Sequence, residues 1–133
     1  MDRVFLDANV LVSAALTPDS RLHALWKRPD VRLTGSPYVI AEARRNVTAP
    51  GAAARLEVLV EAISVLPAEP ADFAMEGDPA LPAKDRPVLL AAIASSSDYL
   101  LTGDATHFGD LFGRAFNGVT VLRPGEYVRA LDE

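Results

Sequence analysis

The chain has 133 residues, of which 50% are hydrophobic, and a formal net charge of -5. This size fits one domain with a sizeable core, and the acidic balance argues against a broad basic surface for nucleic acid. There is no cysteine, which excludes disulfides and thiolate metal sites. The sequence also lacks a membrane-length apolar run and a signal pattern. We therefore expect a single domain over residues 1–133, located in the cytoplasm with no membrane partner.

Short apolar runs alternate with amphipathic stretches through the first half of the chain. The pattern predicts strands where apolar residues end at polar or turn residues, and helices where they recur at i, i+3 and i+4. In chain order we expect a strand from Arg3 that ends at Asp7, a helix over Val10–Leu16, a helix through Leu22, Leu25 and Trp26 that ends at Pro29, a strand over Val31–Thr34, a helix that starts at Ser36-Pro37 and carries Val39, Ile40, Ala43 and Val47, a helix over Ala49–Glu61, and a strand over Ile63–Leu66.

The second half opens with a proline-rich stretch, Pro67–Pro82, which predicts a loop with one helical turn at Asp72–Met75. The remaining elements are a helix over Val88–Ser96 opened by Asp85-Arg86-Pro87, a strand over Tyr99–Thr102, a short helix over Thr106–Phe112, a last strand over Val119–Leu122, and a closing helix from Pro124 to Leu131. Alternating strands and helices predict a parallel sheet with helices on both faces. Right-handed crossovers then bring the carboxyl ends of all strands to one edge.

Four acids occupy positions that this topology would bring together. Asp7 ends the first strand, and Asp104 follows the strand over Tyr99–Thr102. Asp85 begins the helix that leads into that strand, and Glu42 lies on the helix after the second strand. Facing carboxylates repel one another unless a cation or a proton intervenes. All-oxygen sites suit Mg²⁺ and Mn²⁺, whereas a chain with only two histidines and no cysteine is poorly equipped for Zn²⁺.

Each acid also has an ordinary structural interpretation. Asp7 and Asn9 would form a turn and cap the next helix, and Asp85 alone is better explained as a helix N-cap. Asp104 fits a turn residue, and Glu42 fits a solvated helix position. Only their joint placement favours a site.

Several other polar and aromatic residues also have both an ordinary and a functional interpretation. For His107, a supporting or capping role is favoured over donation to a phosphate or a leaving group. His23 is expected to be a surface or partly packed residue, and Trp26 to pack in the core. Arg44 and Arg45 fit a solvated helix face, with contacts to phosphate groups or to a protein partner as the alternative.

Several segments taken together resemble the PIN-domain family, and within it the VapC-like toxin ribonucleases of type II toxin–antitoxin systems. They are Val4-Phe5-Leu6-Asp7-Ala8-Asn9-Val10, Glu42 inside a helix, Lys84-Asp85-Arg86-Pro87-Val88-Leu89, and Asp98-Tyr99-Leu100-Leu101-Thr102-Gly103-Asp104. The resemblance implies a three-layer α/β/α sandwich with a central parallel sheet. The sequence departs from the family at Lys84 and Arg86, because the approach to the third acid is usually more acidic.

The same resemblance implies an active site and partners. It assigns Asp7, Glu42, Asp85 and Asp104 as catalytic residues and ligands of Mg²⁺ or Mn²⁺, with Asn9 supporting Asp7 and Thr102 assisting near the last acid. The expected activity is divalent-metal-dependent hydrolysis of RNA phosphodiester bonds by an endoribonuclease. The expected partners are an RNA substrate and a cognate antitoxin, and a second copy of the chain is a further candidate.

Two other functions stay open at this point. One is a binding module of the same fold that lacks catalysis, although this chain keeps all four acids. The other is a phosphatase of another α/β family. That chemistry would need a nucleophilic Asp-x-Asp at the first strand, where this chain has Asp7-Ala8-Asn9.

Overall fold

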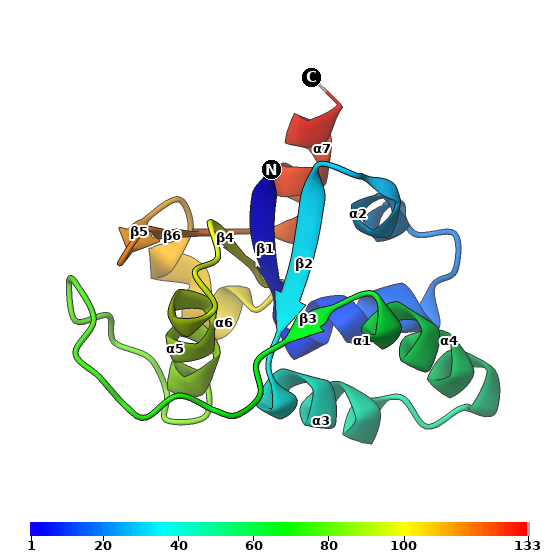
Figure 1. The fold of residues 1–133 in the computed structure, drawn as a ribbon, viewed down its shortest axis with the longest axis horizontal. Helices are drawn as coiled ribbons and strands as arrows, with labels where there is room; N and C mark the ends of the chain where they lie inside the picture. The colour runs from blue at the N-terminus through cyan, green and yellow to red at the C-terminus, as the bar shows by residue number, and fades with distance from the viewer. Residues whose placement is uncertain (133) are drawn as a thin grey trace.

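The computed structural model describes residues 1–132, which form a six-stranded sheet in the order β3-β2-β1-β4-β6-β5 (Figure 1). The strands are β1 (Asp2–Leu6), β2 (Val31–Gly35), β3 (Ser64–Val65), β4 (Tyr99–Leu101), β5 (Ala115–Phe116) and β6 (Val119–Leu122). All neighbouring pairs are parallel except β5 and β6, which are antiparallel. The central strand β1 reads as a continuous apolar run, and Val4, Phe5 and Leu6 are fully buried, as expected for a parallel strand covered on both faces.

Helices cover the sheet on both faces. α1, α2, α3 and α4 lie on one side, and α5 and α6 lie on the other (Figure 1). Their bounds are α1 (Ala8–Leu16), a 3₁₀ turn (Arg21–His23) that leads into α2 (Ala24–Lys27), α3 (Pro37–Asn46), α4 (Pro50–Glu61), α5 (Arg86–Ala94), α6 (Ala105–Phe108) followed by a 3₁₀ turn (Gly109–Leu111), and α7 (Pro124–Leu131). The predicted three-layer α/β/α sandwich is confirmed.

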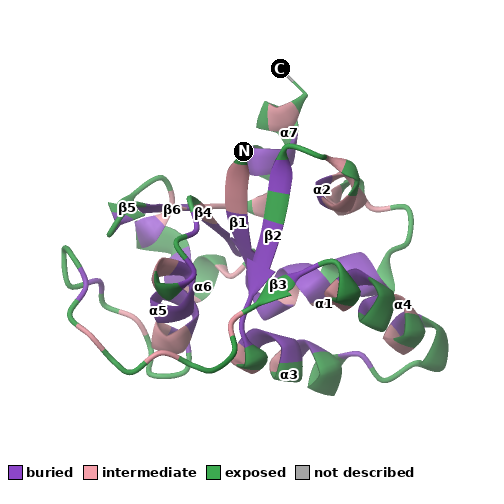
Figure 2. Ribbon diagram, in the orientation of Figure 1, coloured by how far each residue is buried: buried purple, intermediate pink, exposed green. Residues whose placement is uncertain are grey.

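Local sequence explains where these helices begin. A proline in the first turn opens each of α3, α4, α5 and α7, a position where the missing N–H costs nothing and the fixed φ suits a helix. The side chain of Ser36 accepts a hydrogen bond from the N–H of Val39 at the start of α3. Buried residues concentrate in the strands and on the inner helix faces, whereas the outer helix faces are exposed (Figure 2). Among residues 1–132, no helix has the length and apolar character needed to cross a membrane.

The sheet contains one element that the sequence analysis did not predict. β5 pairs with β6 as a hairpin whose turn is Asn117-Gly118, and both turn residues have positive φ, 49° and 86°. Asn-Gly is the preferred dipeptide for a two-residue hairpin turn because it tolerates this backbone. The sheet is therefore parallel through its centre, with one short antiparallel strand at its edge.

The helical turn predicted at Asp72–Met75 is wrong, because residues 71–75 have no regular structure. Arg86 explains the difference. Its guanidinium donates to the Asp72 carboxylate and to the Phe73 carbonyl, at 2.8 Å from Nη2 in each case. The Asp72 carboxylate and the Phe73 carbonyl are thus hydrogen-bonded to a residue outside the segment, and a local helical turn does not form.

Candidate active site

The carboxyl ends of the parallel strands open into a cleft of about 570 Å³. The four acids singled out in the sequence all line it, and so do Asn9 and Lys84; the acids are Asp7, Glu42, Asp85 and Asp104. They reach it from separate elements, namely the end of β1, the middle of α3, the start of α5 and the connection after β4. This is the edge at which ligands bind in open α/β sheets.

Asp7 is buried at the rim of the sheet, with 5% of its surface exposed. Its Oδ1 accepts a hydrogen bond from the N–H of Ala8 at 2.7 Å. Its Oδ2 accepts from Thr102 Oγ1 at 2.9 Å and from Asn9 Nδ2 at 3.1 Å. The pKa of the Asp7 carboxyl is raised to about 6 in all, chiefly by burial; the hydrogen bonds from Thr102 and Ala8 oppose the rise, and the charges of Glu42 and Asp85 contribute to it. The carboxylate is thus fixed in position by three donors while its charge is disfavoured.

Asn9 and Thr102 connect the ends of the two central strands. Asn9 Oδ1 accepts from the N–H of Gly103 at 2.8 Å, and Asn9 Nδ2 also donates to Thr102 Oγ1 at 3.2 Å. Thr102 Oγ1 in turn accepts from the N–H of Asp104 at 3.1 Å. The network holds the connection that carries Asp104 against the end of β1.

Asp85 stands at the N-terminus of α5, and its side chain makes no capping hydrogen bond. Only 8% of the residue is exposed, and its Oδ2 has no hydrogen-bond partner among residues 1–132. Burial raises the pKa of the Asp85 carboxyl, and the charge of Asp104 adds to the rise, while His107 and Lys84 lower it. The capping interpretation therefore does not account for this side chain.

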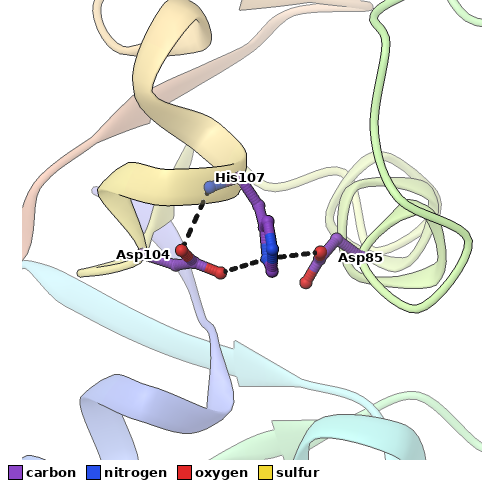
Figure 3. Close-up of side chains that lie close together, drawn as sticks. All are labelled: Asp85, Asp104 and His107. Atoms are coloured by element: carbon purple, nitrogen blue, oxygen red, sulfur yellow. Dashed lines mark hydrogen bonds and ion pairs between the residues drawn. The ribbon is translucent and has the colours of Figure 1, made fainter.

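Asp104 and His107 face Asp85 across the cleft (Figure 3). Asp104 Oδ1 accepts from the N–H of His107 at 3.1 Å, which caps α6. His107 Nδ1 lies 2.8 Å from Asp104 Oδ2 and 2.9 Å from Asp85 Oδ2. Neither short contact has the alignment of an N–H hydrogen bond, since Nδ1 is buried without a hydrogen-bond partner in the described chain. Asp85, Asp104 and His107 each offer a ligand atom, and these atoms lie within 4.8 Å of one another.

Glu42 contributes charge to the cleft from α3. It is half-buried, and its charge raises the pKa of both Asp7 and Tyr38, after burial as the larger cause for each. It is not part of the group of close ligand atoms formed by Asp85, Asp104 and His107. The structure thus brings two of the four acids into direct reach of one ion, and places Asp7 and Glu42 on the same cleft.

The sequence did not predict the contacts of two residues that shape the approach to Asp85. Tyr38 donates from its hydroxyl to the carbonyl of Lys84 at 2.6 Å, and its N–H donates to Glu69 Oε2 at 3.0 Å. Arg86 holds the Pro67–Pro82 segment through Asp72 and Phe73. Tyr38 thus fixes the backbone just before Asp85, and Arg86, the residue just after it, is tied to Asp72 and Phe73. The partners of Tyr38 and Arg86 are distant in the sequence, so no local sequence pattern predicts these contacts.

The tryptophan and the other arginine and histidine residues named above are not part of the group formed by Asp85, Asp104 and His107. Trp26 packs partly buried against the core and donates from Nε1 to the Leu59 carbonyl at 3.0 Å. Arg44 pairs with Glu57 on α4 at 2.8 Å, and both side chains are about half exposed. Arg45 is exposed. His23 Nε2 lies 2.8 Å from the Ala14 carbonyl.

A family of known proteins matches this sequence, and several solved structures share its fold. The family model of the PIN domain matches residues 3–106. The fold is similar to that of VapBC2 from Rickettsia felis bound to a DNA fragment from its promoter, with a TM-score of 0.60, 17% identity, and coverage of 91% of this chain and 98% of the other. VapBC-1 from nontypeable Haemophilus influenzae gives a TM-score of 0.59, 15% identity, and coverage of 92% and 98%.

A third solved structure is the Sarcin-Ricin loop cleaving toxin VapC20 of Mycobacterium tuberculosis, with a TM-score of 0.51, 15% identity, and coverage of 76% of this chain and 91% of the other. At these identities, the three structures show a shared fold. Among curated proteins, none matches the sequence significantly.

Proposed function

Since this chain belongs to the PIN-domain family, we propose that it is a divalent-metal-dependent endoribonuclease and the toxin of a toxin–antitoxin pair. The observation that carries the proposal is the cleft lined by Asp7, Glu42, Asp85 and Asp104. Acids gathered at one edge from four separate elements repel one another, and an ion relieves that repulsion. The fold shared with VapC20, a toxin that cleaves the Sarcin-Ricin loop, supports RNA as the substrate class.

The donor set fits a divalent cation. Asp85 Oδ2 and His107 Nδ1 are buried without hydrogen-bond partners among residues 1–132, and buried polar atoms are rarely left so without a reason. Carboxylate oxygens are the ligands that Mg²⁺ and Mn²⁺ prefer. We assign Asp85 and Asp104 as holding the ion, with Asp7 and Glu42 completing the acidic site. When bound, such an ion supplies positive charge to a phosphodiester and acidifies water.

The chain's own residues have distinct tasks in this proposal. Thr102 and Asn9 fix the Asp7 carboxylate through their hydrogen bonds to Oδ2, so it faces the scissile phosphate without reorganising. Glu42, half-buried on α3, orients the attacking water or serves as a further ligand. Lys84 lines the cleft and is exposed, which suits it to attract a backbone phosphate towards a protein of negative net charge.

The test is cleavage of a mixed RNA pool by the purified protein with Mg²⁺, with Mn²⁺ and with excess chelator. We expect cleavage with either ion and none in chelator. Asp7→Asn and Asp104→Asn should abolish it, whereas Asp110→Asn, at an exposed acid that does not line the cleft, should leave it unchanged. Arg45→Ala should cost far less than Asp7→Asn. Cleavage that persists in chelator or at the wild-type rate in the two acid variants would overturn the assignment.

We also propose that the protein is cytoplasmic and has a protein partner, because a free ribonuclease is harmful in the cytoplasm. We propose a cognate antitoxin that covers the cleft, and a second copy of the chain as a further partner. Two of the similar solved structures are of VapBC proteins, which supports the antitoxin. Co-expression with the product of the adjacent gene should yield a stable complex with reduced cleavage. Active protein that is recovered alone without toxicity would argue against the toxin role.

A further inference from the structure

The histidine on α6 lies against two acids of the cleft, Asp85 and Asp104, in a way that a purely acidic site does not explain. His107 Nδ1 lies 2.8 Å from Asp104 Oδ2 and 2.9 Å from Asp85 Oδ2, and the three side chains converge from α5 and α6 (Figure 3). An imidazole donating one N–H would align with one of the two oxygens. Neither contact is so aligned, because Nδ1 and Asp85 Oδ2 are both without a hydrogen-bond partner in the described chain.

The distances match a shared ion better than a hydrogen bond. Ligands at neighbouring corners of an octahedron, with bonds of about 2.1 Å, lie about 3 Å apart. The two contacts of Nδ1 have this spacing. In such an arrangement the lone pair of the nitrogen points at the ion between the ligands and not along the line to either oxygen. Asp85 is 8% exposed, and its Oδ2, 2.9 Å from Nδ1, also has no hydrogen-bond partner among residues 1–132.

The backbone holds His107 in this position. Its own N–H donates to Asp104 Oδ1 at 3.1 Å, so one oxygen of Asp104 fixes the helical turn and the other faces Nδ1. The side chain of His107 is 27% exposed, which leaves the outer part of the ring near solvent and Nδ1 inside. The geometry therefore does not depend on a freely rotating surface histidine.

We propose that His107 is a direct ligand of the bound ion through Nδ1, which makes this a site of two carboxylates and one imidazole. The inference rests on the proposed function insofar as an ion occupies the cleft. An imidazole ligand favours a first-row transition ion over Mg²⁺, whose preference is for oxygen. The site should therefore bind Mn²⁺ more tightly than Mg²⁺, and His107 should account for the difference.

The experiment uses the intact chain loaded with Mn²⁺ and detects a bound nitrogen by pulsed electron paramagnetic resonance. Wild type should show the modulation of a coordinated imidazole ¹⁴N. His107→Gln should lose that signal, and His23→Gln should keep it, because His23 lies in the 3₁₀ turn after α1, with its Nε2 against the Ala14 carbonyl. Calorimetry should show a loss of at least about tenfold in Mn²⁺ affinity for His107→Gln, the scale seen when metal-site partners are removed, and little change for Mg²⁺.

If His107→Gln fails to fold, the spectra of wild type and His23→Gln decide the inference, because His107 is the one histidine left in His23→Gln. Mn²⁺ bound without a nitrogen signal, or with a signal that survives in folded His107→Gln, would overturn it. In that case Mg²⁺-dependent RNA cleavage would still uphold the proposed function, so the two failures are distinguishable. Absence of both Mn²⁺ binding and RNA cleavage would overturn both.

Discussion

The buried carboxyl of Asp7 should make the metal-free protein less stable as the pH rises. Burial raises the pKa of this group to about 6 from its ordinary value of 3.8. The folded state therefore holds a proton that the unfolded state releases, and the free energy of unfolding falls between these two values. Well below pH 3.8 the group is neutral in both states and carries no penalty; above pH 7 it is ionised in both, and the full penalty applies.

The size of the effect follows from the difference between about 6 and 3.8. At 1.36 kcal/mol per pH unit this corresponds to about 3 kcal/mol, most of it developed between pH 4 and pH 7. Solvent screens this charge little, because only 5% of Asp7 is exposed. Asp7→Asn keeps the shape and removes the charge. An amide nitrogen cannot accept from the donors on both sides of the carboxylate, so the variant carries a constant cost of about 1 kcal/mol at all pH values.

The assay is urea unfolding in chelator from pH 4 to pH 8, followed by the fluorescence of Trp26, the only tryptophan. The free energy of unfolding of Asp7→Asn minus that of wild type should rise by about 2 to 3 kcal/mol across this range. The change with pH is independent of the constant cost of the amide. Asp110→Asn, at an exposed position, should show no such rise. Parallel pH curves for wild type and Asp7→Asn would refute the reasoning.

Two further substitutions test residues outside the acidic cluster. Tyr38→Phe removes the hydroxyl that donates to the Lys84 carbonyl. It should cost about 1 kcal/mol of stability, and it should lower RNA cleavage several-fold because the backbone next to Asp85 is held less firmly. Unchanged cleavage by the folded variant would contradict this. Asn117→Ala should cost about 1–2 kcal/mol in urea unfolding, because Asn117 has a positive φ of 49° and accepts from the N–H of Glu76. Asn117→Gly should recover the part due to the backbone, and equal losses in the two variants would argue against this reason.

Much of the architecture follows from local sequence. Apolar runs that end at Asp7 and before Asp104 mark strand ends, and prolines at the first turns of α3, α5 and α7 mark helix starts. β5 escaped prediction because two residues, Ala115–Phe116, are too few for a period to show. The Asn117-Gly118 turn was the available signal.

The site is predictable to the extent that it depends on topology. Asp7 and Asp104 reach one edge because parallel strands end there, and the cleft does contain both. The place of His107 depends instead on how one short helix turns after Asp104 and on where α5 presents Asp85. Such a contact joins residues 22 positions apart through side-chain directions, which no sequence period encodes. The same holds for the hydrogen bond from Tyr38 to Lys84.

The cleft consists of two parts that differ in how their polar atoms are satisfied. Around Asp7, the hydrogen bonds from Ala8, Thr102 and Asn9 occupy both carboxylate oxygens. Around Asp85, a buried oxygen and a buried ring nitrogen have no hydrogen-bond partner in the described chain. The part around Asp7 is held in place by hydrogen bonds before any ligand binds. The part around Asp85 contains buried polar atoms without hydrogen bonds, and these lower the stability of the metal-free protein. Functional sites commonly keep such a cost because a ligand relieves it. The binding free energy of an ion beside Asp85 therefore includes the repulsion between carboxylates that the ion removes. The carboxylate of Asp7 is already held in position and does not have to rearrange when the ion binds.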